Sequence, residues 1–501
     1  MTSLNFEETI IHSILTDDLK NAASLLAKNP GKMPLLTELL KTVREKPLPL
    51  DHIKSKDPDF VVFFPSYTCG VGCKMCSTGF ANKTQLYENY FHMTPEQFES
   101  CMPWIKKSSF VIFCGLGETL DSPHMIDFLR KIPDKISSIY TSGVPLTRNK
   151  IRELIQAGLK ILTFSFDGKT ELGHGAGNPV YTRKFWEKID WVEQLKSEMN
   201  SPFPKVTLNI AISRDNQDEL NELIDTAQQR GIKEISIDPM VSFDNQDFDK
   251  TIFSDFTNSK EKLNPVLDRW NSEGLDVKQT GFSNSFIDSN SCPYIDNWLN
   301  FVGADSSTLL AGVCEGPLEI PKPIQNFENK ENWNSFPMRY LRYLHFYSSE
   351  QENKPMQCQN CILTNLKNFA DLSLARNSGK GNEEDRALKH YRFASQLKVE
   401  KKWDAAHQGF LKSMENHHDF TLKGKAYFHL GEIELIRKNY PEAKKHFELA
   451  VQHYYNHALA FAYLYLLLML DPLPSTARLM EKFDASGLVH SLYDKHLATI
   501  S

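Results

Sequence analysis

The stretch DFVVFFPSYTCGVGCKMCSTGF, residues 59–80, joins a β-rich run to three closely spaced cysteines. The run 59–67 is rich in β-branched and aromatic residues, which favours a strand. Cys69, Cys73 and Cys76 follow it, separated by three residues and then by two. Three thiolates on one loop can hold three positions of a metal centre. The stretch therefore predicts a strand whose C-terminal end carries a metal-binding loop.

Short β-rich runs alternate with amphipathic helical stretches from residue 57 to about residue 240. The other five runs are 110–114, 137–141, 160–166, 205–213 and 234–239. The helical stretches are 95–105, 125–135, 147–158, 183–199 and 216–231, and Asn216 is expected to cap the last of them. Six strands alternating with helices predict an α/β fold, a parallel sheet curved into a partial (β/α)6 barrel. Ligands then bind at the C-terminal ends of the strands.

The chain of 501 residues is long enough for three or four domains. Residues 1–56 are expected to form an N-terminal helical segment and residues 57–250 the barrel. Residues 251–380 are rich in Asn, Ser and Pro and carry four well-spaced cysteines, and residues 381–501 are expected to be helical throughout.

The C-terminal part contains an internal repeat. KKWDAAHQGFLKS (401–413) and KNYPEAKKHFELA (438–450) align at an offset of 37 residues. The pattern resembles the tetratricopeptide repeat, whose usual period is 34 residues. Two to three repeats fit, with Ala458–Leu470 as a buried helix of the third, and a generic helical bundle is the alternative. Because such arrays offer concave binding surfaces, a peptide or protein partner is expected on them.

Charge and terminal sequence narrow the class of protein. The net charge of −6 gives no reason to expect binding to nucleic acid or to an anionic membrane. The N-terminus lacks a basic region typical of a secretory signal, and the apolar run of 13 residues at 458–470 is too short to span a bilayer. We therefore expect a cytoplasmic chain, in which the nine cysteines are metal ligands, catalytic groups or core residues rather than disulfides.

The cysteine triplet suits an iron–sulfur cluster better than zinc. A closed zinc site takes four ligands, and the nearest histidine, His92, lies well past the loop. Three cysteines on a 4Fe-4S cluster leave one iron without a protein ligand, which makes that iron available for chemistry.

The C-x3-C-x2-C spacing after the first strand of an α/β barrel resembles the radical S-adenosylmethionine (SAM) superfamily. The resemblance implies a 4Fe-4S cluster on Cys69, Cys73 and Cys76, whose open iron binds the amino and carboxylate groups of SAM. It also implies that an electron cleaves SAM to methionine and a 5′-deoxyadenosyl radical, which takes a hydrogen from substrate. Met75 stands where the family often has an aromatic residue near the adenine.

Further motifs at successive strand ends extend the resemblance. Gly117 and Glu118, in FCGLGETL (113–120), match the family's glycine–glutamate motif for the SAM amino group, although Thr119 replaces the usual proline. A tight βα connection is the alternative reading of this stretch.

The next three strand ends supply weaker matches. Ser142 lies in a Thr-Ser-Gly sequence where the family often has Thr-Asn-Gly, and Ser165 and Asp167 match its Ser-x-Asp-Gly. The resemblance implies that they bind the ribose or carboxylate of SAM, with Asn209 as a further candidate. A common turn, or a hydrogen bond to neighbouring backbone in the case of Asn209, is the alternative for each.

A second cysteine set follows the barrel: Cys292, Cys314, Cys358 and Cys361. Zinc would accept these four thiolates equally well. Their position resembles the SPASM/twitch extension, and four cysteines match the shorter twitch form with one auxiliary 4Fe-4S cluster that transfers electrons. The two remaining cysteines, Cys101 and Cys114, are expected to be core residues.

The resemblance implies a radical SAM enzyme that abstracts hydrogen from a peptide, protein or carrier-presented substrate, with an electron donor such as flavodoxin or ferredoxin. The auxiliary cysteines resemble those of members that dehydrogenate a small alcohol, sugar or cyclitol, which is one alternative. A non-catalytic iron–sulfur or zinc scaffold that binds a partner through its repeats is another.

Overall fold

The computed structural model describes residues 6–29, 31–43, 46, 48–53, 57–71, 73, 76, 92–115, 117–168, 179–240, 245–279, 292, 295, 298–303, 309–312, 332–347, 354–359, 381–415, 419–455 and 457–471. Three of the predicted site residues, Met75, Cys314 and Cys361, lie outside these ranges. Within them, no helix has the length and apolar character needed to cross a membrane.

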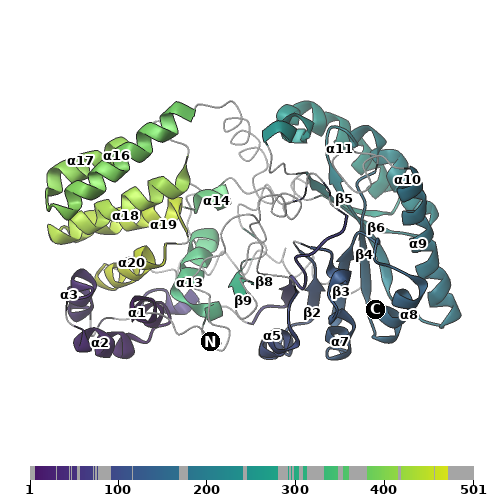
Figure 1. The fold of residues 1–501 in the computed structure, drawn as a ribbon, viewed down its shortest axis with the longest axis horizontal. Helices are drawn as coiled ribbons and strands as arrows, with labels where there is room; N and C mark the ends of the chain where they lie inside the picture. Colours follow the sequence, from purple (N-terminus) through teal and green to yellow (C-terminus); the bar gives the residue numbers. More distant parts are fainter. Residues whose placement is uncertain are drawn as a thin grey trace.

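All six predicted strands form, and each pairs in parallel with the next along the chain. They are β1 (Phe60–Phe63), β2 (Phe110–Phe113), β3 (Ile136–Thr141), β4 (Ile161–Ser165), β5 (Lys205–Ile212) and β6 (Glu234–Pro239). The predicted α/β class, followed by a helical C-terminal region, is therefore confirmed (Figure 1).

The sheet continues beyond the predicted barrel at both edges. β7 (Asp276–Gln279) pairs in parallel with β6, and β8 (Trp298–Gly303) pairs in parallel with β1. β9 (Leu309–Gly312) then pairs antiparallel with β8. The parallel pattern thus runs past residue 250, where the sequence placed the end of the barrel, because α11 (Phe256–Ser272) and β7 add another helix–strand unit. β8 and β9, from the segment after residue 280, thus extend this same sheet.

Helices cover one face of the sheet. The strand side chains on that face are apolar. They are α5 (Pro95–Ser100), α6 (Met102–Ile105), α7 (Met125–Arg130), α8 (Arg148–Gln156), α9 (Pro179–Glu198), α10 (Leu220–Gln229) and α11. Figure 1 shows α8 to α11 along the outer side of the sheet. Phe63, Phe113 and Phe164 are completely buried on this face, which alternation along a strand predicts for residues that share one side.

Within the described residues, the C-terminal module has two helical hairpins and a fifth helix. They are α16 (Gly381–Val399) with α17 (Trp403–Met414), α18 (Phe420–Ile436) with α19 (Tyr440–His453), and α20 (Ala458–Leu470). The two hairpin turns contain Lys401 at φ 59° and Lys438 at φ 60°. In both turns the amide after the lysine donates to a carbonyl of the preceding helix over 2.9 Å. The offset of 37 residues seen in the sequence is thus present in the backbone.

The N-terminal helices pack onto this C-terminal module. They are α1 (Phe6–Leu15), α2 (Leu19–Lys28) and α3 (Pro34–Thr42), and both α1 and α3 contact α20. α20 has apolar residues all round, and ten of its side chains are buried. The prediction of a buried helix at 458–470 is confirmed, and α1, α2 and α3 form one packed unit with α20 (Figure 1).

A buried ion pair joins this unit to α13 (Phe336–Arg342). The Arg339 side chain is fully buried, and its two terminal nitrogens donate to the two oxygens of Asp17, over 2.8 and 2.7 Å. The Tyr465 hydroxyl of α20 donates to the same carboxylate over 2.9 Å. Asp17 lies in the turn between α1 and α2, so one carboxylate connects three distant parts of the sequence.

Two half-buried histidines belong to the helical module. His453 stacks on Tyr427 at 5.3 Å, and His457 stacks on Phe428 at 4.1 Å between ring centroids. Burial lowers the pKa of both imidazoles to about 4. The neutral form of His457 also accepts the Ala460 amide at the start of α20.

We expect Asp17→Asn to lower the free energy of unfolding by about 3 kcal/mol, because it removes the carboxylate bonded to both terminal nitrogens of the buried Arg339 and leaves only the exposed Asp51 at 3.7 Å. Asn tolerates the positive φ of 69° at this position. The matched control is Asp57→Asn, which removes the half-exposed partner of Lys107 and should change stability by less than about 1 kcal/mol. Urea unfolding of the full chain measures both; equal effects would contradict the role of the Asp17 junction.

We also expect the helical module to lose stability as the pH falls from about 6.5 to about 4. Between these values the unfolded chain binds protons at His453 and His457 that the folded chain excludes, so unfolding becomes more favourable. His457→Asn keeps a capping side chain and removes one titrating group. The difference between the unfolding midpoints at pH 7.5 and pH 5 should shrink in this variant; an unchanged difference would refute the assignment.

Candidate functional site at the C-terminal edge of the sheet

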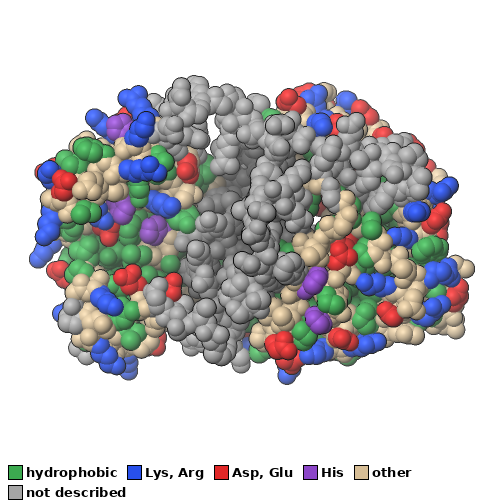
Figure 2. Space-filling model, in the orientation of Figure 1, with side chains coloured by type: hydrophobic (Ala, Val, Ile, Leu, Met, Phe, Trp, Pro, Cys, Tyr) green, Lys and Arg blue, Asp and Glu red, His purple; other side chains and the backbone are tan. Residues whose placement is uncertain are grey.

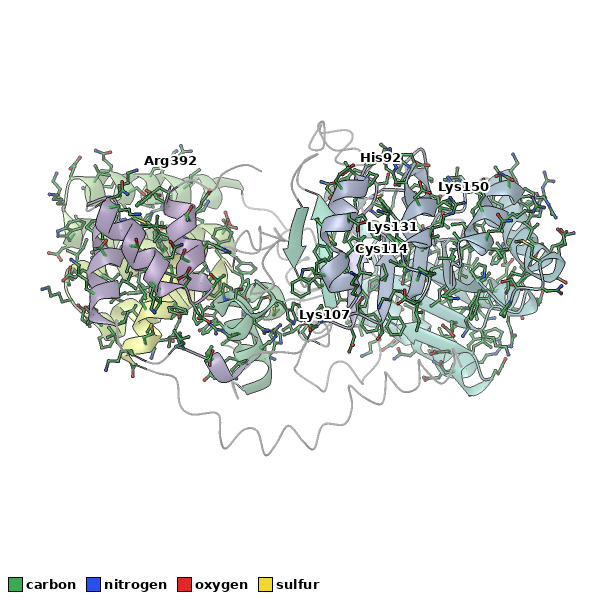
Figure 3. All side chains as sticks on the ribbon, turned by 90° about the horizontal axis from the view of Figure 1, so that it is seen from below. His92, Lys107, Cys114, Lys131, Lys150 and Arg392 are labelled. Atoms are coloured by element: carbon green, nitrogen blue, oxygen red, sulfur yellow. The ribbon has the colours of Figure 1, made fainter. Side chains whose placement is uncertain are left out.

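Four predicted motifs lie directly after four neighbouring strands. The cysteine loop follows β1, Gly117 and Glu118 follow β2, Ser142 follows β3 and Asp167 follows β4. Since these strands are parallel and adjacent, their C-terminal ends share one edge of the sheet. In Figure 3, Lys107 before β2 and Cys114 directly after it mark the direction of the strands, and His92 lies further along that direction.

The cysteine loop begins and ends at one place. Ser66 forms an isolated antiparallel bridge with His92, and the Met93 amide donates to the Pro65 carbonyl over 3.0 Å. The chain between these points carries all three cysteines of the triplet. The two ends of the loop are therefore fixed against each other at the end of β1.

The turn after β2 packs tightly against this root. A Cβ atom on Gly117 would lie 2.5 Å from the Ser66 carbonyl oxygen and 2.7 Å from that of Thr68, so only glycine fits. The Glu118 amide donates to the Thr68 carbonyl over 2.8 Å. Gly117 thus allows the turn after β2 to approach the root of the cysteine loop closely, a role that does not depend on any ligand.

The three thiols of the triplet are not in disulfide bonds. Cys73 is buried, whereas Cys69 and Cys76 are partly exposed, and the Cys76 amide donates to the Cys73 carbonyl over 3.3 Å. Among the described residues, no three His, Cys, Asp or Glu side chains form a group that would hold a single metal ion. The cysteines of an iron–sulfur cluster bind different irons, so three thiols on one anchored loop suit that centre.

Glu118 is 4% exposed and holds the edge together. One carboxylate oxygen accepts the Leu120 amide (3.1 Å) and the Thr141 hydroxyl (2.7 Å). The other accepts the Ser142 amide (2.8 Å) and the Ser142 hydroxyl (2.5 Å). The structure thus brings Glu118 and Ser142 together. The lone pairs of the carboxylate are occupied by hydrogen bonds from neighbouring residues of the chain.

Two lysines attach helices to the same loops. The Lys188 ammonium of α9 donates to the Gly143 carbonyl (2.6 Å) and to the Val144 carbonyl (2.8 Å), and burial lowers its pKa. Lys150 of α8 donates to the Leu120 carbonyl over 2.5 Å. Near them, burial and then the Glu118 charge raise the pKa of Asp121. The edge therefore carries a buried carboxylate at Glu118 and two partly exposed ammonium groups.

Asp167 is buried and binds backbone. Its carboxylate accepts the Ala211 amide of β5 over 2.9 Å. The Asn216 amide group donates to the Asp167 carbonyl (2.7 Å) and to the Ala211 carbonyl (2.9 Å). The predicted capping role of Asn216 is wrong: it makes no cap hydrogen bond, because its side chain joins the ends of β4 and β5.

Ser165 and Asn209 lie on the sheet face opposite the helix-covered one. They are partners in the β4–β5 register, and Asn209 donates to the Asp238 carboxylate of β6 over 2.9 Å. All three are partly exposed, whereas Phe164 and Leu208, on the other face, are completely buried. On this face, the C-terminal ends of β4, β5 and β6 therefore carry polar and partly exposed side chains. The sequence analysis missed Asp238, although its place at the C-terminal end of β6 was a usable signal.

The two remaining cysteines differ in their surroundings. Cys101 is fully buried, and burial raises its pKa to about 12, so its predicted role in the core is confirmed. Cys114 is partly exposed and packs beside the buried cluster of Val62, Phe64 and Tyr67.

Two of the four auxiliary cysteines meet around one lysine. Cys292 precedes β8, and its amide donates to His345 Nδ1 over 3.3 Å. Cys358 lies in α14 (Met356–Gln359), and both thiols act electrostatically on Lys354. Cys292 and Cys358, 66 residues apart, are therefore brought to one locality in the segment between the sheet and the helical module (Figure 1).

No family model matches the chain, and no curated protein matches it. Solved structures do show similarity. Native anSMEcpe with bound AdoMet is 13% identical, with 64% of this chain and 95% of that chain covered, at a TM-score of 0.45. Streptococcus suis SuiB bound to S-adenosylmethionine is 12% identical, with 74% and 90% covered, at a TM-score of 0.43. These values describe a distant similarity of fold, and the function depends on the residues of the site.

We expect Gly117→Ala to destabilise the α/β domain by about 1–3 kcal/mol, because the added methyl overlaps the Ser66 carbonyl. Hydrogen exchange of the Glu118 amide should quicken, since its bond to Thr68 loosens. Gly70→Ala is the matched control, because a Cβ there has no neighbour within 4 Å among the described atoms. The two-loop contact is refuted if the Gly117 variant matches the Gly70 variant in stability and exchange.

Proposed function

We propose that the chain is a radical SAM enzyme. The carrying observation is the placement of the cysteine loop, Glu118, Ser142 and Asp167 at successive C-terminal ends of parallel strands. The root of the cysteine loop is bonded directly to the Gly117–Glu118 turn. A cofactor held by the three thiolates would therefore meet the carboxylate, hydroxyl and amide groups of the same edge.

Cys69, Cys73 and Cys76 would hold a 4Fe-4S cluster, and Met75 would lie beside the adenine of SAM. When bound, the cluster supplies the electron that cleaves SAM to methionine and a 5′-deoxyadenosyl radical, which takes a hydrogen from substrate. The residues of the chain bind and orient the cofactor.

Glu118 is the proposed partner of the SAM ammonium. The Thr141 and Ser142 hydroxyls that now donate to it can rotate, which frees a lone pair for a charge-assisted bond at the end of the edge. Ser142 would then face the same ligand. Asp167 would act mainly by fixing the ends of β4 and β5, since its carboxylate already accepts a backbone amide.

Ser165 and Asn209 are the proposed contacts to the ribose or carboxylate of SAM, and Asp238 joins them. Their side chains are partly exposed at the ends of β4, β5 and β6, and hydroxyl groups of a ribose or a substrate are natural partners for amide and carboxylate groups. These polar side chains support a substrate that presents polar groups beside the cofactor.

For the substrate, we propose a peptide, a protein or a carrier-presented molecule. The two helical hairpins with matching turns support tetratricopeptide-like repeats, which suit a macromolecular partner. The charges on the face seen in Figure 2 are mixed in sign over both parts of the molecule, which suits such a partner better than a polyanion. Oxidation of a small alcohol, sugar or cyclitol is the second candidate, and the four-cysteine auxiliary set favours it.

Cys292, Cys314, Cys358 and Cys361 would hold an auxiliary 4Fe-4S cluster of the SPASM/twitch type. The shared locality of Cys292 and Cys358 supports this site. Four thiolates close the cluster, so its proposed role is to transfer electrons, with flavodoxin or ferredoxin as the external donor.

The anaerobically reconstituted full chain should bind about eight irons and, with dithionite and SAM, release 5′-deoxyadenosine. Replacing Cys69, Cys73 and Cys76 by Ala should leave about four irons and abolish the release, because the open iron is lost. Iron analysis and chromatography of the products measure both.

The control is Cys114→Ala, a partly exposed thiol outside both sets, which should retain about eight irons. Purification with a single zinc and no iron, or no SAM cleavage in a fully loaded and reduced chain, would contradict the proposed enzyme.

A further inference from the structure

Lys354 is a buried cation in the segment that carries the second cysteine set. Its residue is 5% exposed, and it stands four positions before Cys358. The turn between them is fixed by the Cys358 amide on the Pro355 carbonyl (2.8 Å) and by the Gln359 side chain on the Lys354 carbonyl (2.7 Å). Burial of an ammonium is costly unless negative charge lies nearby.

In the described part of the chain, the groups that act electrostatically on Lys354 are the thiols of Cys358 and Cys292. Burial lowers the pKa of Lys354, and the attraction of Cys358 and of Cys292 opposes this effect. The two sulfurs come from opposite ends of a long stretch of sequence, so the fold gathers them around this ammonium.

His345 supplies a second donor at the same place. It is 7% exposed, and its Nδ1 accepts the Cys292 amide over 3.3 Å, so the proton of the neutral ring resides on Nε2. Within the described residues, that buried Nε2 has no hydrogen-bond partner. A buried N–H donor requires an acceptor, and the tautomer excludes Nε2 as a metal ligand while Nδ1 keeps this bond.

A buried ammonium that both thiols attract and a buried imidazole that binds the Cys292 amide therefore lie near each other and near these two cysteines. The sulfides and thiolates of an iron–sulfur cluster are acceptors of negative charge density, and hydrogen bonds and nearby charge set the cluster's reduction potential. Zinc bound to the same cysteines would have no redox change for these groups to affect.

We propose that Lys354 and His345 are positioning residues that raise the reduction potential of the second cluster, Lys354 through its ammonium and His345 through Nε2–H. This inference rests on the auxiliary cluster of the proposed function. Reduction adds one electron to the cluster from an external donor, with no bond broken, and the extra negative charge is stabilised by the buried cation. The second cluster is thereby suited to accept electrons.

The test uses the full-length chain with Cys69, Cys73 and Cys76 replaced by Ala, so that only the second cluster contributes. A dithionite titration followed by electron paramagnetic resonance gives its potential. Lys354→Met should lower the equilibrium constant for reduction about tenfold, which is about 59 mV for one electron. Lys354→Arg should keep the potential of the parent, and His345→Leu should lower it.

Lys423→Met, at a half-buried lysine of α18, is the matched control and should leave the potential unchanged. Iron content and circular dichroism identify any variant that has lost its fold. If Lys354→Met has lost its fold, Lys354→Gln is measured in its place. With four irons bound, an unchanged potential in Lys354→Met, or an equal fall in Lys354→Arg, overturns the inference and spares the cluster. Absence of iron in the parent overturns the auxiliary cluster itself, and with it the inference.

Discussion

The carboxylate of Glu118 is buried at the edge of a parallel sheet, where it accepts four hydrogen bonds from the loops after β2 and β3. A buried charge of this kind persists only when its lone pairs are satisfied. The same residue donates its amide to Thr68, at the root of the cysteine loop. Three strand ends are thereby fixed around one side chain, and the proposed cluster loop takes its position from them. Gly117 makes the approach possible because no side chain fits against the Ser66 carbonyl.

A second ionic contact organises the rest of the molecule. Asp17 binds Arg339 and Tyr465, so the N-terminal helices, α13 and the last described helix meet at one carboxylate. α13 leads directly into His345, and α14 carries Cys358. Cys292 and Cys358 of the second cysteine set are therefore placed near the junction of these elements. This placement gives the module a structural connection to the proposed redox site in addition to any partner it binds.

Local patterns in the sequence were sufficient for the strands and for the order of the motifs. Alternating and continuous apolar runs predicted all six strands, since parallel strands with one helix-covered face need buried residues such as Phe113 and Phe164. The offset of 37 residues indicated the repeat, and the structure has equivalent turns at Lys401 and Lys438. The continuation of the sheet into β7 and β8 was missed because a composition rich in Asn and Ser masks short strands.

Side-chain partners were less predictable, because they depend on contacts between distant segments. Asn216 has the spacing of a helix cap, yet Asp167 and Ala211 offer it buried carbonyls that solvent cannot satisfy. Lys354 and His345 carry no motif, and only the fold brings them to Cys292. The central claim, that Cys69, Cys73 and Cys76 leave one iron open for SAM, is tested most directly by electron–nuclear double resonance on the reduced chain with SAM labelled with ¹⁵N in its amino group. The account predicts a ¹⁵N coupling to the cluster that disappears in the variant with all three cysteines replaced by Ala; absence of coupling in a chain with a full complement of iron and saturating SAM would contradict it.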